Sequence, residues 1–301
     1  MATPRHALYG RGTHAISADE AGDVPLDRDE LALLFSNAFT APGYQPPVLP
    51  STALELLAIA RKPDVTFPIV ARLLEKEPLI VSQVLRLAQS PVYRRAEPIR
   101  SLEQAASMLG LRALADLFLQ ASLSAKVFRA PGYEGPMTQL REHSIATAVV
   151  SRLVCRETSL SDDYAFLCGL LHDIGTAACI IVLAEEYGGR GQEKPHAPLE
   201  GFWPVIRDTH EQIALKLGEM WQLPADVRWV IGHHHVLAAG GPVHPLAAVV
   251  CVADSIATAL GRGFELETDA SQVARAATSL SLTSAQLEKV TLEARRLLSP
   301  T

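Results

Sequence analysis

Apolar residues recur along most of the chain at the three- and four-residue spacing of amphipathic helices, and no segment shows the strict alternation of a half-buried strand. A short helix is expected at 27–39. In the first half the pattern predicts helices that start at Ser51 or Thr52, cover 67–75, run from Pro78 to about 90, and cover 101–109 and 111–127. Ser101 and Gln104 have the spacing of a capping box, in which Gln104 reaches back to the Ser101 backbone N–H.

The second half carries the same helical spacing beyond a break at 131–136, where the sequence reads PGYEGP. Its predicted helices cover 138–156, 161–171, 174–187, 201–220, 224–232, 245–261 and 283–298. Thr283 or Ser284 is the expected N-cap of the last one. The predicted fold class is therefore all-α, a helical bundle of two subdomains.

The helical pattern also suggests where the chain divides. Residues 1–23 lack periodicity and 41–51 are rich in proline, so we expect a mobile N-terminal tail and linker over 1–47. After this tail we expect a helical subdomain at 48–130, a second subdomain at 137–262 and a C-terminal helical extension at 263–301. Proteolysis should cut first before Ser51 and in the polar stretch 188–200, which is expected to be an exposed loop.

Composition narrows the class of protein. With 301 residues, 48% of them hydrophobic, the chain can bury a sizeable core. A net charge of −6 and only 6% aromatic residues argue against a nucleic-acid partner. The start of the chain lacks a signal-peptide core, and no unbroken apolar run approaches a membrane span, so a cytoplasmic location without a membrane partner is expected. The cysteines are expected to be reduced core thiols: Cys155, Cys168, Cys179 and Cys251.

Histidine and aspartate carry the candidate chemistry. Asp173 directly follows His172, and Asp254 interrupts the apolar run AAVVCVADSIATAL. A carboxylate in such a run must be paired, hydrogen-bonded or bound to a metal, because an isolated buried charge is costly. Imidazole and carboxylate ligands together suit Fe, Mn, Zn or Ni. Six of the ten histidines fall in the second half: His143, His172, His210, His233, His234 and His235.

The segment GLLHDIG at 169–175 resembles the signature of the HD superfamily of metal-dependent phosphohydrolases, with His172 and Asp173 as its pair. The segments THEQIALKLGEMWQLP at 209–224 and VADSIA at 252–257 are similar to later parts of the same pattern. The order of ligand-type residues is similar to that of the HD-GYP branch: His143, His172, Asp173, His210, His234, His235 and Asp254.

The first half resembles the N-terminal half of HDOD domains, in LPSTALELLAIARKP and in PIRSLEQAASMLGLRALADLFLQASL. That family joins a helical subdomain to an HD-like one and occurs in bacterial signalling proteins. The similarity to the HDOD domain family covers roughly residues 48 to 260, so the second half of the bundle is expected to be HD-superfamily-like.

The resemblance implies that the chain binds a divalent metal, with Fe, Mn, Zn or Ni as the candidates. It also implies that the site has room for two ions. Asp173 would bridge them and is also the candidate catalytic residue. The other ligands divide into two sets: His143, His172 and Asp254, and His210, His234 and His235. His234 and His235 are preferred to His233 because of the I-x-x-H-H spacing that begins at Ile231.

The sequence departs from the HD-GYP pattern around these ligands. The signature lysine after the aspartate is Thr176, and the carboxylate expected after the paired histidines is Val236. The Gly-Tyr-Pro stretch is replaced by VLAAGGPVHP. These departures favour a regulatory module that acts on a protein partner in a signalling pathway or on a nucleotide ligand. The alternatives are a phosphodiesterase for a cyclic dinucleotide or another nucleotide, and a polar core that binds nothing.

Overall fold

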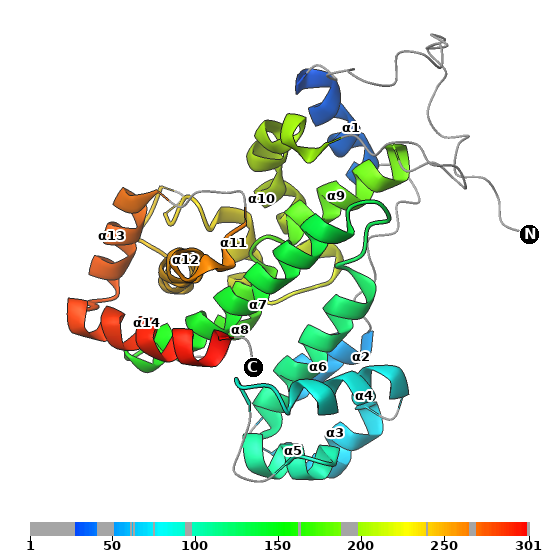
Figure 1. Cartoon of the computed structure of the whole chain (residues 1–301), viewed down its shortest axis with the longest axis vertical. Coiled ribbons are helices and arrows are strands. Elements are labelled where there is room, and N and C mark those ends of the chain that lie inside the picture. Colours follow the sequence, from blue (N-terminus) through cyan, green and yellow to red (C-terminus); the bar gives the residue numbers. More distant parts are fainter. Residues whose placement is uncertain are drawn as a thin grey trace, which may run out of the picture.

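The computed structural model describes residues 28–40, 51–60, 62, 64–74, 76–93, 98–161, 164–187, 198–238, 240–264 and 269–299. Within these ranges every regular element is a helix, and none of the described residues forms a strand (Figure 1). The predicted all-α class is therefore confirmed.

The first group of helices surrounds a central one, α6 (Leu111–Lys126), which is buried from Ala113 to Leu123. Three neighbours pack against α6, and α3 packs beside α2 and α5 at the periphery. The other helices of this group are α2 (Ser51–Ile59), α3 (Phe67–Leu74), α4 (Pro78–Leu87) and α5 (Leu102–Leu109). The sequence predicted all of these helices.

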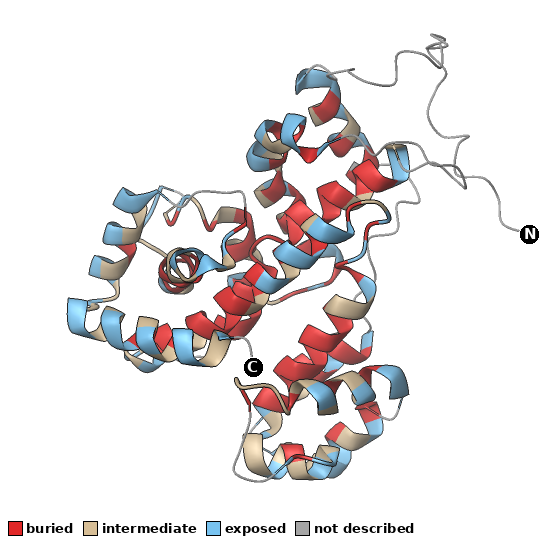
Figure 2. Cartoon of the chain, in the orientation of Figure 1, coloured by how far each residue is buried: buried red, intermediate tan, exposed pale blue. Residues whose placement is uncertain are grey.

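The second group is built around the long helix α7 (Glu134–Arg156), which packs against α8 and α12. Figure 2 shows that these central helices are buried over most of their surface, whereas the C-terminal helices keep exposed outer faces. The group contains α8 (Ala165–Leu171), α9 (Ile174–Tyr187), α10 (Trp203–Met220), α11 (Ala225–His233), α12 (Pro245–Ala257), α13 (Ala270–Ser279) and α14 (Ser284–Leu298). A 3-10 turn at Leu199–Gly201 precedes α10, and a π turn at Thr258–Arg262 extends α12.

Two helices begin several residues away from the predicted position, and one helix was not predicted. Helix α7 begins at Glu134, inside the expected break, because Pro136 lies in the first turn, where a missing N–H costs nothing. Helix α8 begins at Ala165 rather than at 161. Helix α13 was not predicted as a separate helix, although it falls within the expected helical extension at 263–301.

The predicted helix caps are present, with one change of partner. The Ser101 side chain accepts a hydrogen bond from the Gln104 backbone N–H at 3.0 Å. The Gln104 side chain accepts from the Arg100 N–H at 2.8 Å and not from that of Ser101, so the expected capping box is incomplete. The capping box of Thr283 and Gln286 at α14 is complete.

Helix α1 (Arg28–Thr40) confirms the short helix predicted at 27–39. It lies within the expected tail and linker at 1–47, packs on α9 and α10 and buries Leu31 and Phe35. The rest of the expected tail, and 188–197 of the expected loop, lie outside the described residues. The proteolysis prediction for these segments stays a prediction.

Two helical stretches, Ala165–Tyr187 and Pro245–Arg262, are long and apolar enough to cross a membrane by composition alone. The prediction from sequence considered only unbroken apolar runs and therefore did not find these stretches. Their mean hydropathy is high even though single polar residues interrupt them. The most apolar window of each is 94% and 56% buried inside the fold, respectively. Their apolar surface is therefore used largely for packing between helices.

Two glycines allow the helices of the second group to approach closely. A Cβ atom at Gly169 of α8 would lie 2.7 Å from the Ala148 Cα of α7. A Cβ atom at Gly175 of α9 would overlap the His210 carbonyl oxygen of α10. Since these glycines flank His172 and Asp173, the same contacts that close the core also fix the turn that carries both residues.

Candidate metal centre

The seven ligand-type residues predicted from the sequence meet in the interior of the second group. Helix α7 supplies His143, α10 supplies His210 and α12 supplies Asp254. The turn between α8 and α9 carries His172 and Asp173, and the end of α11 is followed by the remaining two, His234 and His235. All are buried except His235, which is half-buried.

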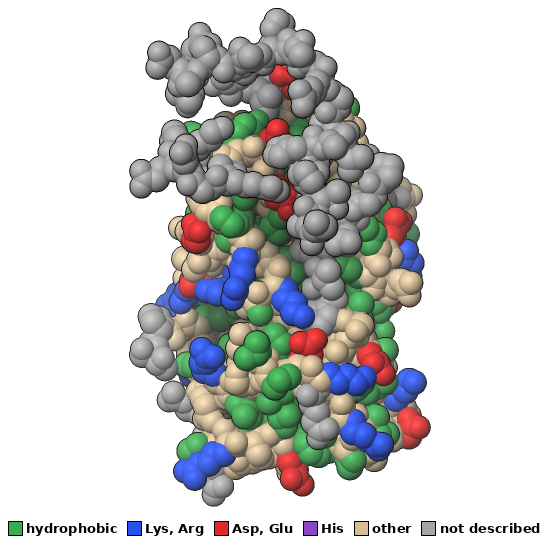
Figure 3. Space-filling model, turned by 90° about the vertical axis from the view of Figure 1, so that its right-hand side faces the viewer, with side chains coloured by type: hydrophobic (Ala, Val, Ile, Leu, Met, Phe, Trp, Pro, Cys, Tyr) green, Lys and Arg blue, Asp and Glu red, His purple; other side chains and the backbone are tan. Residues whose placement is uncertain are grey.

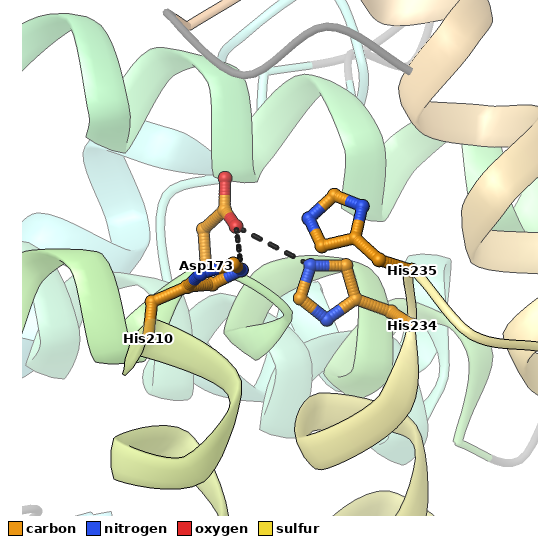
Figure 4. Close-up of side chains that lie close together, drawn as sticks. All are labelled: Asp173, His210, His234 and His235. Carbon is orange, nitrogen blue, oxygen red and sulfur yellow. Dashed lines mark ion pairs between the residues drawn. The ribbon is translucent and has the colours of Figure 1, made fainter. Parts of the chain in front are cut away.

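Asp173 lies between two sets of ligands. Its Oδ2 atom is 3.3 Å from His172 Nε2 and 3.6 Å from His143 Nε2. Its Oδ1 atom is 3.4 Å from His234 Nε2 and 3.8 Å from His210 Nε2 (Figure 4). One carboxylate oxygen therefore faces each set.

Ligand atoms within each set lie within 4.8 Å of one another. The first set is His143, His172 and Asp254, and the second is Asp173, His210, His234 and His235. This grouping matches the division that the family resemblance implies, with Asp173 in the bridging place.

Backbone carbonyls orient three of the imidazoles. His143 Nδ1 lies 2.8 Å from the Arg262 carbonyl oxygen, and His172 Nδ1 lies 2.8 Å from that of Gly169. His210 Nδ1 lies 2.8 Å from the carbonyl oxygen of Arg207. A carbonyl can only accept, so each Nδ1 carries the proton and, in the neutral ring, each Nε2 presents a lone pair to the centre.

With all rings neutral, the centre therefore brings lone pairs and carboxylate oxygens together without a donor. His143 Nε2 is 3.1 Å from His172 Nε2 and 3.2 Å from Asp254 Oδ1. Further atoms that face the centre are buried without a hydrogen-bond partner: Asp173 Oδ1, His210 Nε2, His234 Nε2 and His235 Nε2. Leaving such atoms unpaired costs about 1–3 kcal/mol each. A divalent cation would satisfy them together, and nitrogen and carboxylate ligands suit Fe, Mn, Zn or Ni, so the residues fit a metal.

The pKa values follow from burial and from the shared carboxylate. Burial opposes charge on His172, but Asp173 outweighs it and raises the pKa of His172 to about 9. Burial also works against ionisation of Asp173, yet His172 and His234 hold its pKa well below the usual range. Burial lowers the pKa of His234 to about 4 and that of His235 to about 3. In the metal-free protein a proton on His172 thus supplies the positive charge that the cluster lacks.

The structure places His233 outside the cluster. Its Nδ1 donates to the Trp229 carbonyl oxygen at 2.9 Å, and its ring stacks on the Trp229 ring with centroids 5.0 Å apart. Of the two positions that depart from the HD-GYP pattern, Thr176 is fully buried and Val236 is 45% exposed. A lysine at position 176 would therefore have to be accommodated inside the core.

The sequence did not predict a role for Glu211, which lies on α10 next to His210. Its Oε1 atom accepts a hydrogen bond from the His235 backbone N–H at 2.9 Å. The same atom is 3.6 Å from His234 Nδ1. An isolated glutamate on the polar side of a helix gives no sequence signal, and only the packing of α10 against α11 reveals the contact.

A cavity of about 100 Å³ adjoins the second set of ligands. Asp269 and Gln272, at the start of α13, form one side of it. The remaining lining residues are His234, His235, Val250, Cys251 and Asp254. No lysine or arginine is among these lining residues. Burial raises the pKa of Cys251 to about 12, so this residue is a neutral thiol.

Comparison with known proteins identifies the family. Residues 47–237 match the HDOD domain over more than half of the chain. The chain belongs to the HDOD domain family.

Solved structures share the fold. An HDOD domain protein of unknown function from Geobacter sulfurreducens superposes with a TM-score of 0.67 at 21% identity, covering 90% of this chain and 98% of that one. A protein from Shewanella amazonensis SB2B, described as a proposed metal-dependent phosphohydrolase, gives a TM-score of 0.66 at 17% identity, covering 90% and 97%. A proposed signal transduction protein from Marinobacter aquaeolei VT8 gives a TM-score of 0.63 at 20% identity, covering 93% of this chain and 66% of that one.

One curated relative, an uncharacterized protein of Treponema pallidum (strain Nichols), is 26% identical over 220 residues. The match covers 69% of this chain but only 41% of that protein. The chain thus spans well under half the length of this relative.

Proposed function

We propose that the chain is a metal-binding regulatory module of a bacterial signalling system, located in the cytoplasm, which acts by binding a protein partner. The observation that carries this proposal is the cavity beside the candidate metal centre. Its volume of about 100 Å³ is well below the roughly 300–1,000 Å³ of typical ligand pockets. A cyclic dinucleotide has no room there.

The charge of the cavity supports the same proposal. Its lining includes the carboxylates of Asp254 and Asp269 and no lysine or arginine. Enzymes that transfer phosphoryl groups place cations where charge develops on the phosphoryl oxygens. None of the residues that line this cavity is such a cation, Asp269 adds a carboxylate that is not a candidate ligand, and the buried Thr176 supplies no charge.

The second candidate function is a metal-dependent phosphohydrolase. The complete set of ligand-type residues favours it, as does the description of the Shewanella amazonensis relative. Bound divalent metal would supply a nucleophilic hydroxide and stabilise the charge on phosphoryl oxygens. In this chain Asp173 would hold both metal positions, while the carbonyl-bonded rings of His143, His172 and His210 keep their Nε2 atoms aimed at them.

One experiment separates the candidates. The protein is purified without chelator, its metal content is measured, and hydrolysis of bis(p-nitrophenyl) phosphate and of cyclic dinucleotides is assayed with added Mn or Fe. We expect bound metal with turnover no greater than that of Asp173→Ala. Robust turnover that Asp173→Ala abolishes would establish the hydrolase instead. Absence of metal after Fe, Mn, Zn and Ni have been offered would leave only a polar core.

A further inference from the structure

His234 differs from the other buried imidazoles of the centre in how its outer nitrogen is held. The Nδ1 atoms of His143, His172 and His210 each face a backbone carbonyl. His234 Nδ1 has no such partner and is buried without a hydrogen bond. The group that faces it is the carboxylate of Glu211, whose Oε1 atom is 3.6 Å away.

The same Glu211 oxygen accepts from the His235 backbone N–H at 2.9 Å. One carboxylate therefore holds two consecutive residues at the end of α11, both of which belong to the second set of ligands. Since α11 ends at His233, no further helical turn orients these two side chains. Their placement relies on contacts made by other elements.

The two ligand sets also differ in charge. Besides the shared Asp173, the first set has a carboxylate of its own in Asp254, whereas the second has only imidazoles. A dication at the second position would thus meet less negative charge than one at the first.

We infer that Glu211 is the positioning residue of the second metal position: it orients His234 and His235 from α10 and supplies the negative charge that their own set lacks. This inference rests on the proposed metal binding. Carboxylates behind metal-bound histidines fix the ring orientation and raise ligand basicity, and removing one typically lowers metal affinity by about 10–100-fold. Glu211 thereby provides, from a different helix, a carboxylate next to the paired histidines, where the chain itself continues with Val236.

The alternative is that Glu211 merely closes the turn after α11 through its bond to the His235 N–H. Glu211→Gln separates the two roles. The glutamine retains an oxygen that can accept from that N–H but carries no charge to stabilise a dication through His234. A purely structural role predicts wild-type metal binding by this variant, whereas a positioning role predicts weakened binding at one position only.

The test is a titration of metal-free full-length protein with Mn²⁺ and Zn²⁺, followed by calorimetry. We expect two ions per wild-type chain. Glu211→Gln should weaken binding of one ion by about 10–100-fold and leave the other unchanged. Glu219→Gln, an exposed change on the same helix, should behave as wild type. Nitrogen NMR of His234 supplies a readout independent of metal, since its Nδ1 signal should shift in Glu211→Gln and not in Glu219→Gln.

The outcomes are distinct. Two ions with equal affinities in wild type and Glu211→Gln would overturn the role of Glu211 while leaving the proposed metal site intact. A wild-type chain that binds no ion would overturn the proposed metal site and this inference together. Loss of both ions in a folded Glu211→Gln would overturn the assignment of Glu211 to the second position alone.

Discussion

Two clusters of polar side chains in the described part of the chain, one between the halves and one in the candidate metal centre, are built on opposite principles. Between the halves, Asp116 of α6 lies 3.4 Å from the Arg152 guanidinium of α7, which also lies over the Phe166 ring at 5.4 Å. Here the protein supplies both signs of charge. In the candidate metal centre the clustered side chains are imidazoles and carboxylates, and His143 Nε2 lies 3.1 Å from His172 Nε2. The first cluster contains its own permanent cation, whereas the second takes up its positive charge from solution, as a proton on His172 or as a metal ion.

Helix α7 carries a member of each cluster. His143 and Arg152 are nine residues apart, which is about two and a half helical turns, so they point to opposite sides of the helix. One face of α7 thus lies at the interface with the first group of helices, and the opposite face lies at the candidate metal centre. If the comparison is right, changes on one face should alter folding stability and changes on the other should alter metal binding. Figure 3 views a further face of the molecule, on which charged and hydrophobic side chains are interspersed.

The largest effect is expected from breaking the internal ion pair. Arg152→Met removes the cation that lies 3.4 Å from the buried Asp116 carboxylate, and breaking a buried pair in this way typically costs about 3–5 kcal/mol. Denaturant unfolding measures this loss, and metal content per folded chain should stay unchanged. The matched control is Arg156→Met, one turn further along α7, whose partner Glu293 is 3.7 Å away in an exposed pair. Such pairs contribute about 0–1 kcal/mol, so equal losses from the two variants would contradict the contrast.

Metal removal comes next. At free metal about 100 times its dissociation constant, bound metal stabilises the fold by about 2.7 kcal/mol. Chelation should remove that stabilisation from wild type and lower the thermal midpoint. Asp173→Ala, which lacks the bridging carboxylate, should bind little metal and be insensitive to chelator. His233→Ala should respond as wild type, because His233 stacks on Trp229 outside the cluster. Equal loss of metal from both variants would show that the assignment of the three consecutive histidines is wrong.

The sequence predicted much of the fold and also the residues of the candidate metal centre, but the two predictions rest on different features of the sequence. Helical spacing of apolar residues predicted the helices, but a proline such as Pro136 fits both a break and a first turn, so the start of α7 was misplaced. Helix α13 has one fully buried residue, Ala276, and too few apolar positions to show a pattern. The uneven distribution of histidine and the position of Asp254 in an apolar run brought the candidate ligands to notice, and the family resemblance then ordered them and divided them into two sets. Glu211 was missed because its contact depends on the packing of α10 on α11.

A smaller, graded effect is expected from pH. Below a pKa of about 9, His172 carries a proton that bound metal must displace. Metal affinity should therefore rise by about tenfold per pH unit between about pH 6 and 8, which is about 1.4 kcal/mol per unit, and the rise should level off above about 9. Calorimetry in buffers of different ionisation enthalpy counts the released proton. The difference in unfolding free energy between metal-free Arg152→Met and metal-free wild type should not change by a comparable amount per pH unit, because Arg152 does not titrate in this range. Affinity independent of pH would contradict a protonated His172.

The smallest equilibrium effect is expected at the cavity wall. Gln272→Ala removes a side chain that lines the cavity and is not itself a candidate ligand. Metal affinity should change by less than about twofold, while the rate of metal loss to an added chelator should rise because the opening widens. Stopped-flow transfer of Zn²⁺ to a chromogenic chelator measures the rate. An unchanged rate would show that the ions leave by another route.

The narrow cavity beneath α13 has a consequence for how the protein obtains its metal. A cation in this space of about 100 Å³ lies among the imidazoles of His234 and His235 and the carboxylates of Asp254 and Asp269. Affinity for divalent metals rises from Mn²⁺ to Cu²⁺ whatever the protein, so a site at equilibrium follows that order. The ion that fills the site would therefore depend on which divalent metals the cell makes available as well as on the ligands that the chain provides.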